Sequence, residues 1–492
     1  MLGRIVFASV LGSSLFLPRT LHAQSDVAFP PEVYAQRRTR LAERVGGAPV
    51  IVPGEYLIGS GGVGKQDPNF WYLTGVESPY AILVTAPGSD GRREVLFLPE
   101  EFQFAGAQYP LDDARFRRAA WNRPIRRLSP GAAAVKATGI PETHPLDELT
   151  ERLPQVVGGA ETVYFARDSR RLYAPPGLTP PRSIRQQLEQ AISERLPGKR
   201  LKNVTPIVEH MRLIKDQYEI AALRRAAEIS VKSFHEVMAA VRPGMNDLEV
   251  AGLMEYVWKR EGSPRASFDP IVSSGEAAVS LYTLKSENYN PVDRVMQGGE
   301  LLFIDYGAAE YDMYASDVCR TYPVSGRFTA EQRKYYEIVL EAQEAALARI
   351  KPGVMMLDVV KAAAEVFRKH GLERFEDIGR MGEGRVWGLM PSPTHYLGRG
   401  AGISRSYSGV RGTGVRDLGH HIGLDTIDGR DSSLPLAPGM VFTVEPKMYI
   451  PEKSLAIMIE DMILVTEGGY ENLSADAPRS VEGIEKAMAA KR

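Results

Sequence analysis

The stretch LLFIDYGAAEYDMYASDVCRTYPVSG, from Leu301 to Gly326, decides how this chain is interpreted. Two apolar runs, LLFIDY and MYASDV, flank a polar turn and predict the two strands of a hairpin. Each run ends near an aspartate, Asp305 in the first and Asp317 in the second. Because a buried, unpaired carboxylate costs several kcal/mol, acidic residues in apolar strands need a chemical reason.

Two further carboxylates lie in apolar runs nearer the carboxyl terminus. VFTVEP contains Glu445, and LAIMIEDMILV contains Glu460, which strand alternation places on one apolar face with Met458 and Met462. Any one of the four acids alone can be understood as a turn cap or an ion-pair partner. Four together repel one another, so bound divalent cations are the economical solution.

One histidine completes an oxygen-rich ligand set. The segment DLGHHIGLD places His420 and His421 ahead of Glu445. Oxygen ligands with one imidazole favour Mn²⁺, Co²⁺ or Fe²⁺, and Zn²⁺ also fits. Four carboxylates exceed what one catalytic ion needs, so we predict two ions about 3.5–4 Å apart. Such a pair lowers the pKa of a bridging water and polarises a carbonyl, which indicates hydrolysis.

Length and composition limit the alternatives. The 492 residues predict two domains, or three at most, and 44% apolar with 25% charged residues is typical of a globular protein. A net charge of −1 gives no basis for binding nucleic acid. The single cysteine, Cys319, excludes intramolecular disulfides and cysteine-rich metal clusters.

Residues 1–23 have the layout of a secretory signal peptide. Arg4 precedes an apolar run, and the preferred cleavage point follows Ala23. The run is too short to span a bilayer comfortably, although an uncleaved anchor is the alternative. We expect an exported protein, periplasmic or extracellular, with no membrane span after signal removal.

The rest of the chain changes character near its middle. Residues 24–204 mix strand-like runs with helical segments and predict an α/β domain. Residues 205–485 predict an α+β domain, in which Asp216 and Glu219 form a capping box at the start of a long amphipathic helix. VRPGMNDLEV and IKPGVMMLDV repeat one construction, so internal pseudo-two-fold symmetry is expected.

These motifs resemble those of a known family. DYG…DVCRT, GHHIGLD, PGMVFTVEP and IEDMILVT are similar to the metal-site motifs of the pita-bread metallopeptidases, and most closely of the Xaa-Pro aminopeptidases (aminopeptidase P), with prolidases as near relatives. QDPNFWYLTGVESPYAILV resembles the amino-terminal domain of the same family. The resemblance implies a pita-bread catalytic domain and removal of an amino-terminal residue that precedes proline.

The resemblance also implies roles for single residues. Asp305 would bind one ion, and Asp317 and Glu460 would bridge two. His420 and Glu445 would complete the shell of the other ion. Glu445 would also carry the proton from the bridging water to the leaving amine, which makes it the predicted catalytic residue. Two divalent ions are expected, with Mn²⁺ preferred over Co²⁺, Fe²⁺ or Zn²⁺.

The chain departs from the family around the metal site. Histidines of the family are replaced by Tyr282, Arg416 and Ile427, an arginine by Met458 and a tyrosine by Phe268. In the family these histidines contact the substrate carbonyl, and loss of one such donor typically costs ~10²–10³ in rate.

Three residues are therefore candidates for contact with substrate: Tyr282, His395 and His421. His395 lies in a Gly/Ser/Arg-rich stretch that resembles an insertion, residues 391–416. Its segment THYLG also resembles the family's ligand-histidine segment, which leaves His395 as an alternative ligand, although the residues downstream favour His420.

Three functions follow from these observations. The first is an exported metal-dependent aminopeptidase that cleaves Xaa-Pro bonds in peptides. The second is a prolidase, or a metallohydrolase whose specificity has moved away from proline. The third, a non-catalytic binding module on the same fold, is disfavoured because all five predicted ligands are present. The sequence leaves open whether the protein forms a homo-oligomer.

Overall fold

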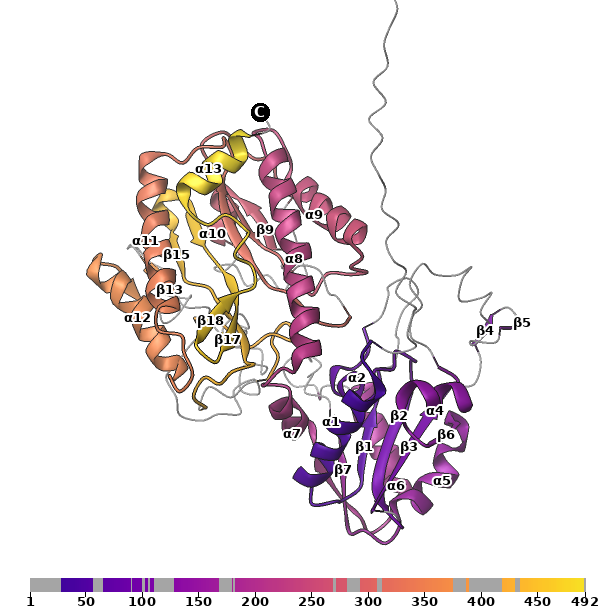
Figure 1. Cartoon of the computed structure of the whole chain (residues 1–492). Coiled ribbons are helices and arrows are strands. Elements are labelled where there is room, and N and C mark those ends of the chain that lie inside the picture. Colours follow the sequence, from indigo (N-terminus) through magenta and orange to yellow (C-terminus); the bar gives the residue numbers. More distant parts are fainter. Residues whose placement is uncertain are drawn as a thin grey trace, which may run out of the picture.

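The amino-terminal part of the chain is built on one mixed six-stranded sheet of order β6-β3-β2-β1-β7-β8, with helices on both faces (Figure 1). The strands are β1 (Val50–Pro53), β2 (Ile82–Gly88), β3 (Gly91–Leu98), β6 (Glu142–Pro145), β7 (Thr162–Phe165) and β8 (Arg200–Asn203). The computed structural model describes residues 28–55, 65–89, 91–99, 102–104, 107–109, 128–167, 179, 182–268, 271–280, 293–307, 312–374, 386–388, 418–429 and 434–490.

Alternating apolar residues in the central strands give this sheet two buried faces. Along β1, Val50 and Val52 join the core that includes helices α1, α2 and α4, whereas Ile51 joins the core formed with α5 and α6. The predicted α/β domain is confirmed. The helices are α1 (Pro31–Arg44), α2 (Pro68–Thr74), α4 (Ala132–Thr138), α5 (Leu149–Val157) and α6 (Ile184–Arg195); β4 (Phe102–Phe104) and β5 (Ala107–Tyr109) pair separately.

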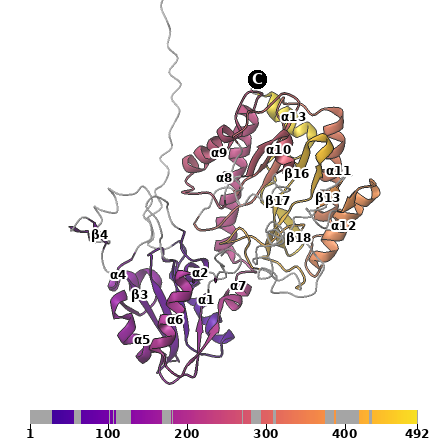
Figure 2. The ribbon, with the colours of Figure 1, turned by 180° about the vertical axis from the view of Figure 1, so that it is seen from behind.

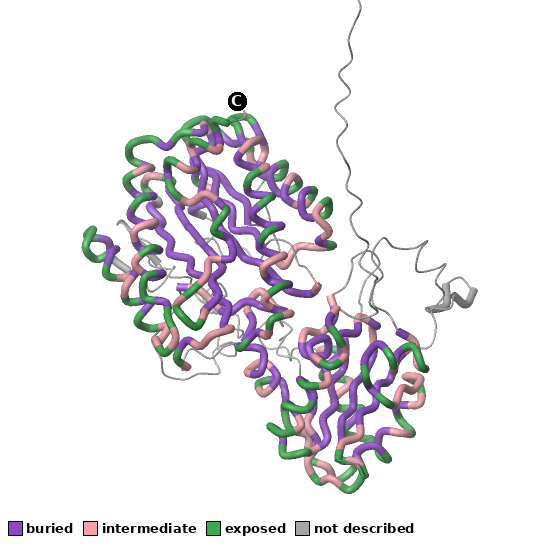
Figure 3. Tube along the Cα trace, in the orientation of Figure 1, coloured by how far each residue is buried: buried purple, intermediate pink, exposed green. Residues whose placement is uncertain are grey.

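The second part of the chain encloses three short sheets between helices, α8 and α9 on one side and α11 and α12 on the other (Figures 1 and 2). Most of its described strands are buried, while the outer faces of the helices are exposed (Figure 3). The helices are α7 (Thr205–Met211), α8 (Gln217–Ala240), α9 (Asp247–Glu261), α10 (Gly275–Ser280), α11 (Ala330–Leu347), α12 (Met356–Lys369) and α13 (Val481–Ala489).

The three sheets have the orders β11-β10-β9, β12-β13-β15-β16 and β14-β17-β18. Their strands are β9 (Ile271–Ser274), β10 (Leu301–Asp305), β11 (Cys319–Pro323), β12 (Glu373–Arg374), β13 (Val386–Gly388), β14 (Val441–Val444), β15 (Lys447–Ile450), β16 (Leu455–Met458), β17 (Asp461–Thr466) and β18 (Gly469–Asn472). None of the helices in the described ranges is both long and apolar enough to cross a membrane.

The repeated sequence construction produces the same turn twice. After α8, Gly244 has φ 91° and donates its N–H to the Met296 carbonyl at 2.9 Å. After α11, Gly353 has φ 84° and donates to the Leu436 carbonyl at 2.8 Å. A positive φ is readily adopted only by glycine, which explains why both segments read Pro-Gly. The predicted sequence repeat therefore forms the same local turn at both places.

One strand of the predicted hairpin is displaced. The run MYASDV is not a strand, because β11 begins at Cys319, whose register partner in β10 is Asp305. Residues 312–318 instead begin with a turn in which Asp312 and Met313 have positive φ. The Ala315 N–H then donates to the Gly423 carbonyl at 2.7 Å. Asp317 therefore lies in an irregular segment before the strand.

The run LAIMIEDMILV is also not one continuous strand. It divides at Ile459 and Glu460 into β16 and β17, which belong to different sheets. At the break, the Glu460 N–H donates to the Cys319 carbonyl at 3.0 Å, so the chain exchanges one strand partner for another. The predicted strict alternation through Glu460 is therefore wrong, although its side chain is buried as expected.

Candidate metal centre

The predicted ligands come from separate chain segments that meet between the two halves of the second domain. Asp305 ends β10, and Asp317 lies two residues before β11. Glu445 follows β14, and Glu460 occupies the break between β16 and β17. His420 comes from the segment 418–429. Each acid is at a strand end, where the backbone leaves regular pairing and the side chain can turn inward.

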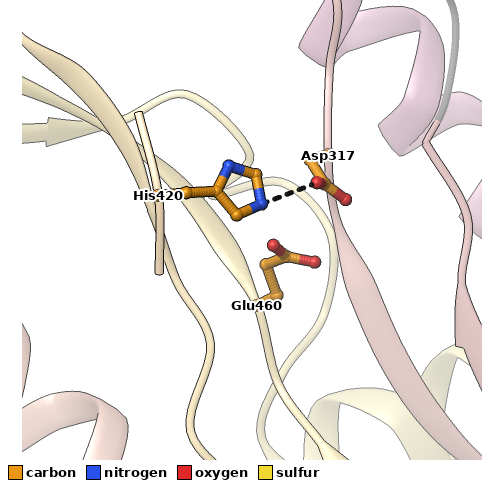
Figure 4. A group of neighbouring side chains, drawn as sticks. All are labelled: Asp317, His420 and Glu460. Atoms are coloured by element: carbon orange, nitrogen blue, oxygen red, sulfur yellow. Dashed lines mark ion pairs between the residues drawn. The ribbon is translucent and has the colours of Figure 1, made fainter. Parts of the chain in front are cut away.

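All four carboxylates are buried, with relative exposures of 0–3%: Asp305, Asp317, Glu445 and Glu460. Asp317, His420 and Glu460 each offer one ligand atom, and these three atoms lie within 4.8 Å of one another. Figure 4 shows the imidazole and the two carboxylates pointing toward one shared space. The His420 Nε2 is 3.4 Å from Asp317 Oδ2 and 3.7 Å from Glu445 Oε1.

The electrostatics of this cluster are those of crowded like charges. Burial, and then the neighbouring carboxylates, raise the pKa of Glu460 well above its ordinary value. Burial also raises the pKa of Glu445, although the charges of Lys447 and His420 oppose the rise. Burial disfavours protonation of His420, but the Asp317 and Glu445 carboxylates outweigh it and raise the pKa of His420 to about 9. The cluster attracts cations.

Several carboxylate oxygens of the same cluster accept no hydrogen bond from the described residues. Asp317 Oδ1, Glu445 Oε2 and Glu460 Oε2 are buried, and none has a hydrogen-bond partner among the described residues. An unsatisfied buried carboxylate oxygen is expensive, and a cation satisfies it. The converging Asp317 and Glu460 carboxylates with one imidazole are a donor set that suits Mn²⁺, Fe²⁺, Co²⁺ or Zn²⁺, so the residues fit a metal site.

Thr443 orients two of the predicted ligands. Its hydroxyl donates to Glu445 Oε1 at 2.9 Å and accepts the His420 N–H at 3.1 Å. The Thr443 N–H in turn donates to the His420 carbonyl at 2.9 Å. This threonine thus fixes Glu445 Oε1, which lies near His420, whereas Oε2 accepts no hydrogen bond from the described residues.

Close approach of the His420 segment to β14 requires glycine. A Cβ on Gly419 would lie 1.8 Å from the Thr443 carbonyl oxygen.

We expect Gly419→Ala to displace the His420 backbone, to lower the free energy of unfolding by about 1–3 kcal/mol and to weaken Mn²⁺ binding. Thermal unfolding and calorimetric titration would measure both effects. Gly468→Ala is the matched control, since no atom lies within 4 Å of a Cβ there. Equal behaviour of the two variants would contradict the expectation.

Buried charges outside the cluster hold the His420 segment in place. Asp428 contacts Arg212 and Lys215, and the Lys215 Nζ is 3.3 Å from Asp428 Oδ2. All three side chains are 0–2% exposed. Burial opposes ionisation of Asp428, but the two cations lower its pKa below the ordinary value. Arg212 also donates to Asn69 of α2 at 2.8 Å, which connects the amino-terminal domain to this segment.

His421, predicted to contact substrate, points away from the cluster. Its backbone bridges to Phe442, and its ring lies 6.1 Å from the Phe442 ring. Burial, and then the charge of Lys215, lowers the pKa of His421 to about 4, so the imidazole is neutral. The structure does not bring His421 together with the predicted ligands.

The structure describes only some of the other positions named from the sequence. Tyr282, His395 and Arg416 lie outside the described residues. Met458 is buried on β16, and Phe268 packs against the Tyr306 ring at 6.5 Å between centroids. A Cβ on Gly307 would meet the Phe268 ring at 1.7 Å, so these two residues fit only as a pair.

Sequence reasoning missed Lys447. Its side chain is fully buried, and its Nζ lies 3.7 Å from Glu445 Oε2. The available signal was a lysine two residues after Glu445 in the otherwise apolar run KMYI, since a strand places alternate residues on one face. The Asp428 ion pairs were also missed, because their partners are far apart in sequence.

Buried carboxylates that converge with one imidazole define a metal-dependent hydrolase, and comparisons with known proteins specify which kind. Residues 221–467 match the model of metallopeptidase family M24, and residues 34–164 match that of the aminopeptidase P amino-terminal domain. The chain therefore belongs to metallopeptidase family M24, and within it to the Xaa-Pro aminopeptidase group of pita-bread enzymes.

Individual relatives are similar to this chain over most of its length. It is 32% identical to the Xaa-Pro aminopeptidase of Escherichia coli strain K12, over 87% of this chain and 90% of that one. It is 32% identical to Xaa-Pro aminopeptidase 2 of Streptomyces coelicolor, over 92% and 90%. The solved structure of E. coli aminopeptidase P with the inhibitor Pro-Leu superposes with a TM-score of 0.72 at 27% identity, covering 94% of this chain and 99% of that one. The predicted family and enzyme class, a metallo-aminopeptidase, are confirmed.

Proposed function

We propose that this protein is an exported, dinuclear metallo-aminopeptidase that releases an amino-terminal residue preceding proline. The convergence of Asp317, His420 and Glu460 on one space carries the proposal, together with the buried free oxygens of the cluster. The similarity to Xaa-Pro aminopeptidases over both domains supports the prolyl specificity. Mn²⁺ is the ion we propose, and residues 1–23 are the proposed export signal.

The residues themselves define a division of labour. Asp305, Asp317 and Glu460 would hold the ions, together with His420 and Glu445. Divalent ions bound there supply Lewis acidity, which lowers the pKa of a bound water and polarises the scissile carbonyl. Glu445 is fixed by Thr443 through one oxygen, and its other oxygen is available to accept a proton and return it to the leaving amine.

Burial of the cluster assists this proton transfer. Because burial raises the pKa of Glu445, the carboxylate is a stronger base than an exposed one and remains able to pass the proton on. The Glu445 side chain is 0% exposed, so bulk water does not compete for its oxygens. The chain's own residues thus orient Glu445, and Glu445 carries the proton.

A second candidate is a metallohydrolase of shifted specificity, either a prolidase or an enzyme that does not require proline. It is favoured by the replacements at Met458 and Phe268, which change the surroundings of the cluster. A non-catalytic module is a weaker candidate, because the predicted ligands are present and Asp317, His420 and Glu460 converge.

Peptide cleavage separates these candidates. We expect mature protein loaded with Mn²⁺ to release alanine from Ala-Pro-Ala, with products identified by mass spectrometry and no release after chelation. Ala-Pro and Ala-Ala-Ala are the comparison substrates. Cleavage of Ala-Pro alone would make the enzyme a prolidase, and cleavage of Ala-Ala-Ala at a similar rate would remove the requirement for proline. If Mn²⁺ binds and none of the three is cut, the prolyl proposal fails.

A further inference from the structure

A lysine side chain lies inside the carboxylate cluster. Lys447 is the first residue of β15 and is 0% exposed, and its Nζ is 3.7 Å from Glu445 Oε2, an oxygen without a hydrogen-bond partner among the described residues. The charge of Lys447 also acts on Glu460. A lysine is almost never fully buried unless it is paired, so this amine belongs to the charge balance of the cluster.

The strand register explains how Lys447 reaches this place. In the antiparallel pair β15–β16, Lys447 is opposite Met458, which is the second residue before Glu460. Directly opposed residues in such a pair project to the same face of the sheet. Met458 belongs to an apolar cluster with Phe303 and Cys319, next to the strand ends that carry the acids. Lys447 is therefore a cationic side chain on the face of the sheet that also carries Met458.

Charge counting shows the consequence for metal binding. Metal binding requires ionised carboxylates and a neutral His420 imidazole, and in that form the four carboxylates and the Lys447 ammonium carry a net charge of −3. One divalent ion reduces this to −1, and a second makes the cluster positive by one charge. Without the lysine, two divalent ions would neutralise the four carboxylates. The ammonium repels both ions, and it repels more strongly the ion that binds nearer to it, so it weakens one of the two binding steps more than the other.

We infer that Lys447 acts as a permanent third cation of the metal centre. It stabilises the carboxylates before metal binds, and it increases the difference in affinity between the two ion-binding steps. The Lys447 Nζ lies 3.7 Å from Glu445 Oε2, so we assign the weaker step to the ion that Glu445 helps to hold. The inference rests on the proposed dinuclear centre. It predicts a protein that retains one ion firmly and takes up the second only at higher free metal concentration.

The test is a calorimetric titration of chelator-stripped, full mature protein with Mn²⁺. In Lys447→Met, which keeps the length of the side chain and removes its charge, the ratio of the second to the first dissociation constant is expected to fall at least about tenfold. Lys447→Arg keeps the charge and should retain the wide ratio of the unmodified protein. Lys453→Met is the matched control, since Lys453 pairs with the exposed Glu331 outside the cluster.

The outcomes separate the inference from the proposed function. An unchanged ratio in Lys447→Met, or a weaker second step, overturns the role of Lys447 and shows a purely structural lysine. One ion in the unmodified protein and two in Lys447→Met supports the inference in its strongest form. No metal bound by the unmodified protein overturns the proposed metal centre itself, and the inference with it. If Lys447→Met does not fold, Lys447→Gln provides the same comparison.

Discussion

Replacement of Glu460 by glutamine should abolish activity and, in the absence of metal, stabilise the protein. Glutamine keeps the shape of the side chain and is neutral, so it avoids the free-energy cost of either ionising Glu460 beside the other carboxylates or keeping it protonated in the folded state. We expect metal-dependent peptide cleavage to fall at least ~10³-fold, since the loss of several kcal/mol of charge stabilisation is involved. The metal-free protein should gain at least about 1 kcal/mol, or about 2–4 °C in Tm.

Activity should fall while the stability of the metal-free protein should rise, so a general loss of folding cannot explain both results. Activity on Ala-Pro-Ala and thermal unfolding after chelation would be measured on the same preparations. Glu467→Gln, in the exposed turn after β17, is the control and should change neither quantity. A Glu460→Gln variant that unfolds at a lower temperature without metal would show that Glu460 is held by stabilising contacts, and that the cluster is not a site of electrostatic repulsion.

Replacement of Asp428 by asparagine should produce the largest loss of stability. Asp428 is the carboxylate shared by Arg212 and Lys215, and the change leaves two buried cations without it. Removing one partner of a buried ion pair typically costs about 3–5 kcal/mol. The segment that carries His420 should also lose its anchor, and outer residues that orient a ligand typically contribute 10–100-fold to metal affinity.

Asp425→Asn is the matched control. Asp425 pairs with the same Arg212, with 2.7 Å between Asp425 Oδ2 and the guanidinium, but its side chain is 46% exposed. A surface pair is worth about 0–1 kcal/mol, so this variant should remain close to the unmodified protein. Denaturant unfolding and Mn²⁺ titration would compare the two. A similar small loss in both variants would mean that the buried network does not hold the segment.

Sequence patterns predicted the helices and the repeat well, because these depend on local chemistry. The capping box of Asp216 and Glu219 is present as expected, with the Glu219 N–H 3.0 Å from Asp216 Oδ1. The two Pro-Gly turns were equally visible, since Gly244 and Gly353 adopt the backbone angles that only glycine takes readily.

The strand ends could not be predicted in the same way. Residues such as Asp317 and Glu460 stand in runs that alternate like strands, yet the chain leaves regular pairing at both positions. The cause is tertiary: β11 starts where it meets Asp305, and β16 ends where the chain turns to bond Cys319. Single-strand periodicity contains no information on a partner from elsewhere in the sequence.

The sequence predicted the cluster best where several carboxylates had to be buried together, because buried like charges need a shared counter-charge. Four acids in apolar runs indicated one common site, and the structure brings Asp317 and Glu460 together with His420. The assigned role of each ligand stays a prediction. His421 was a poorer inference, because adjacency to His420 says nothing about which way a side chain points, and its ring faces Phe442.

The dispersed origin of the cluster has a consequence for how the protein matures. Asp317 belongs to the first half of the second domain, whereas His420 and Glu460 belong to the second half. No stretch of chain that ends before residue 460 contains all three residues, so metal capture cannot assist early folding of the first half. Metal uptake is therefore a late event, and it reports that the two halves have closed on each other.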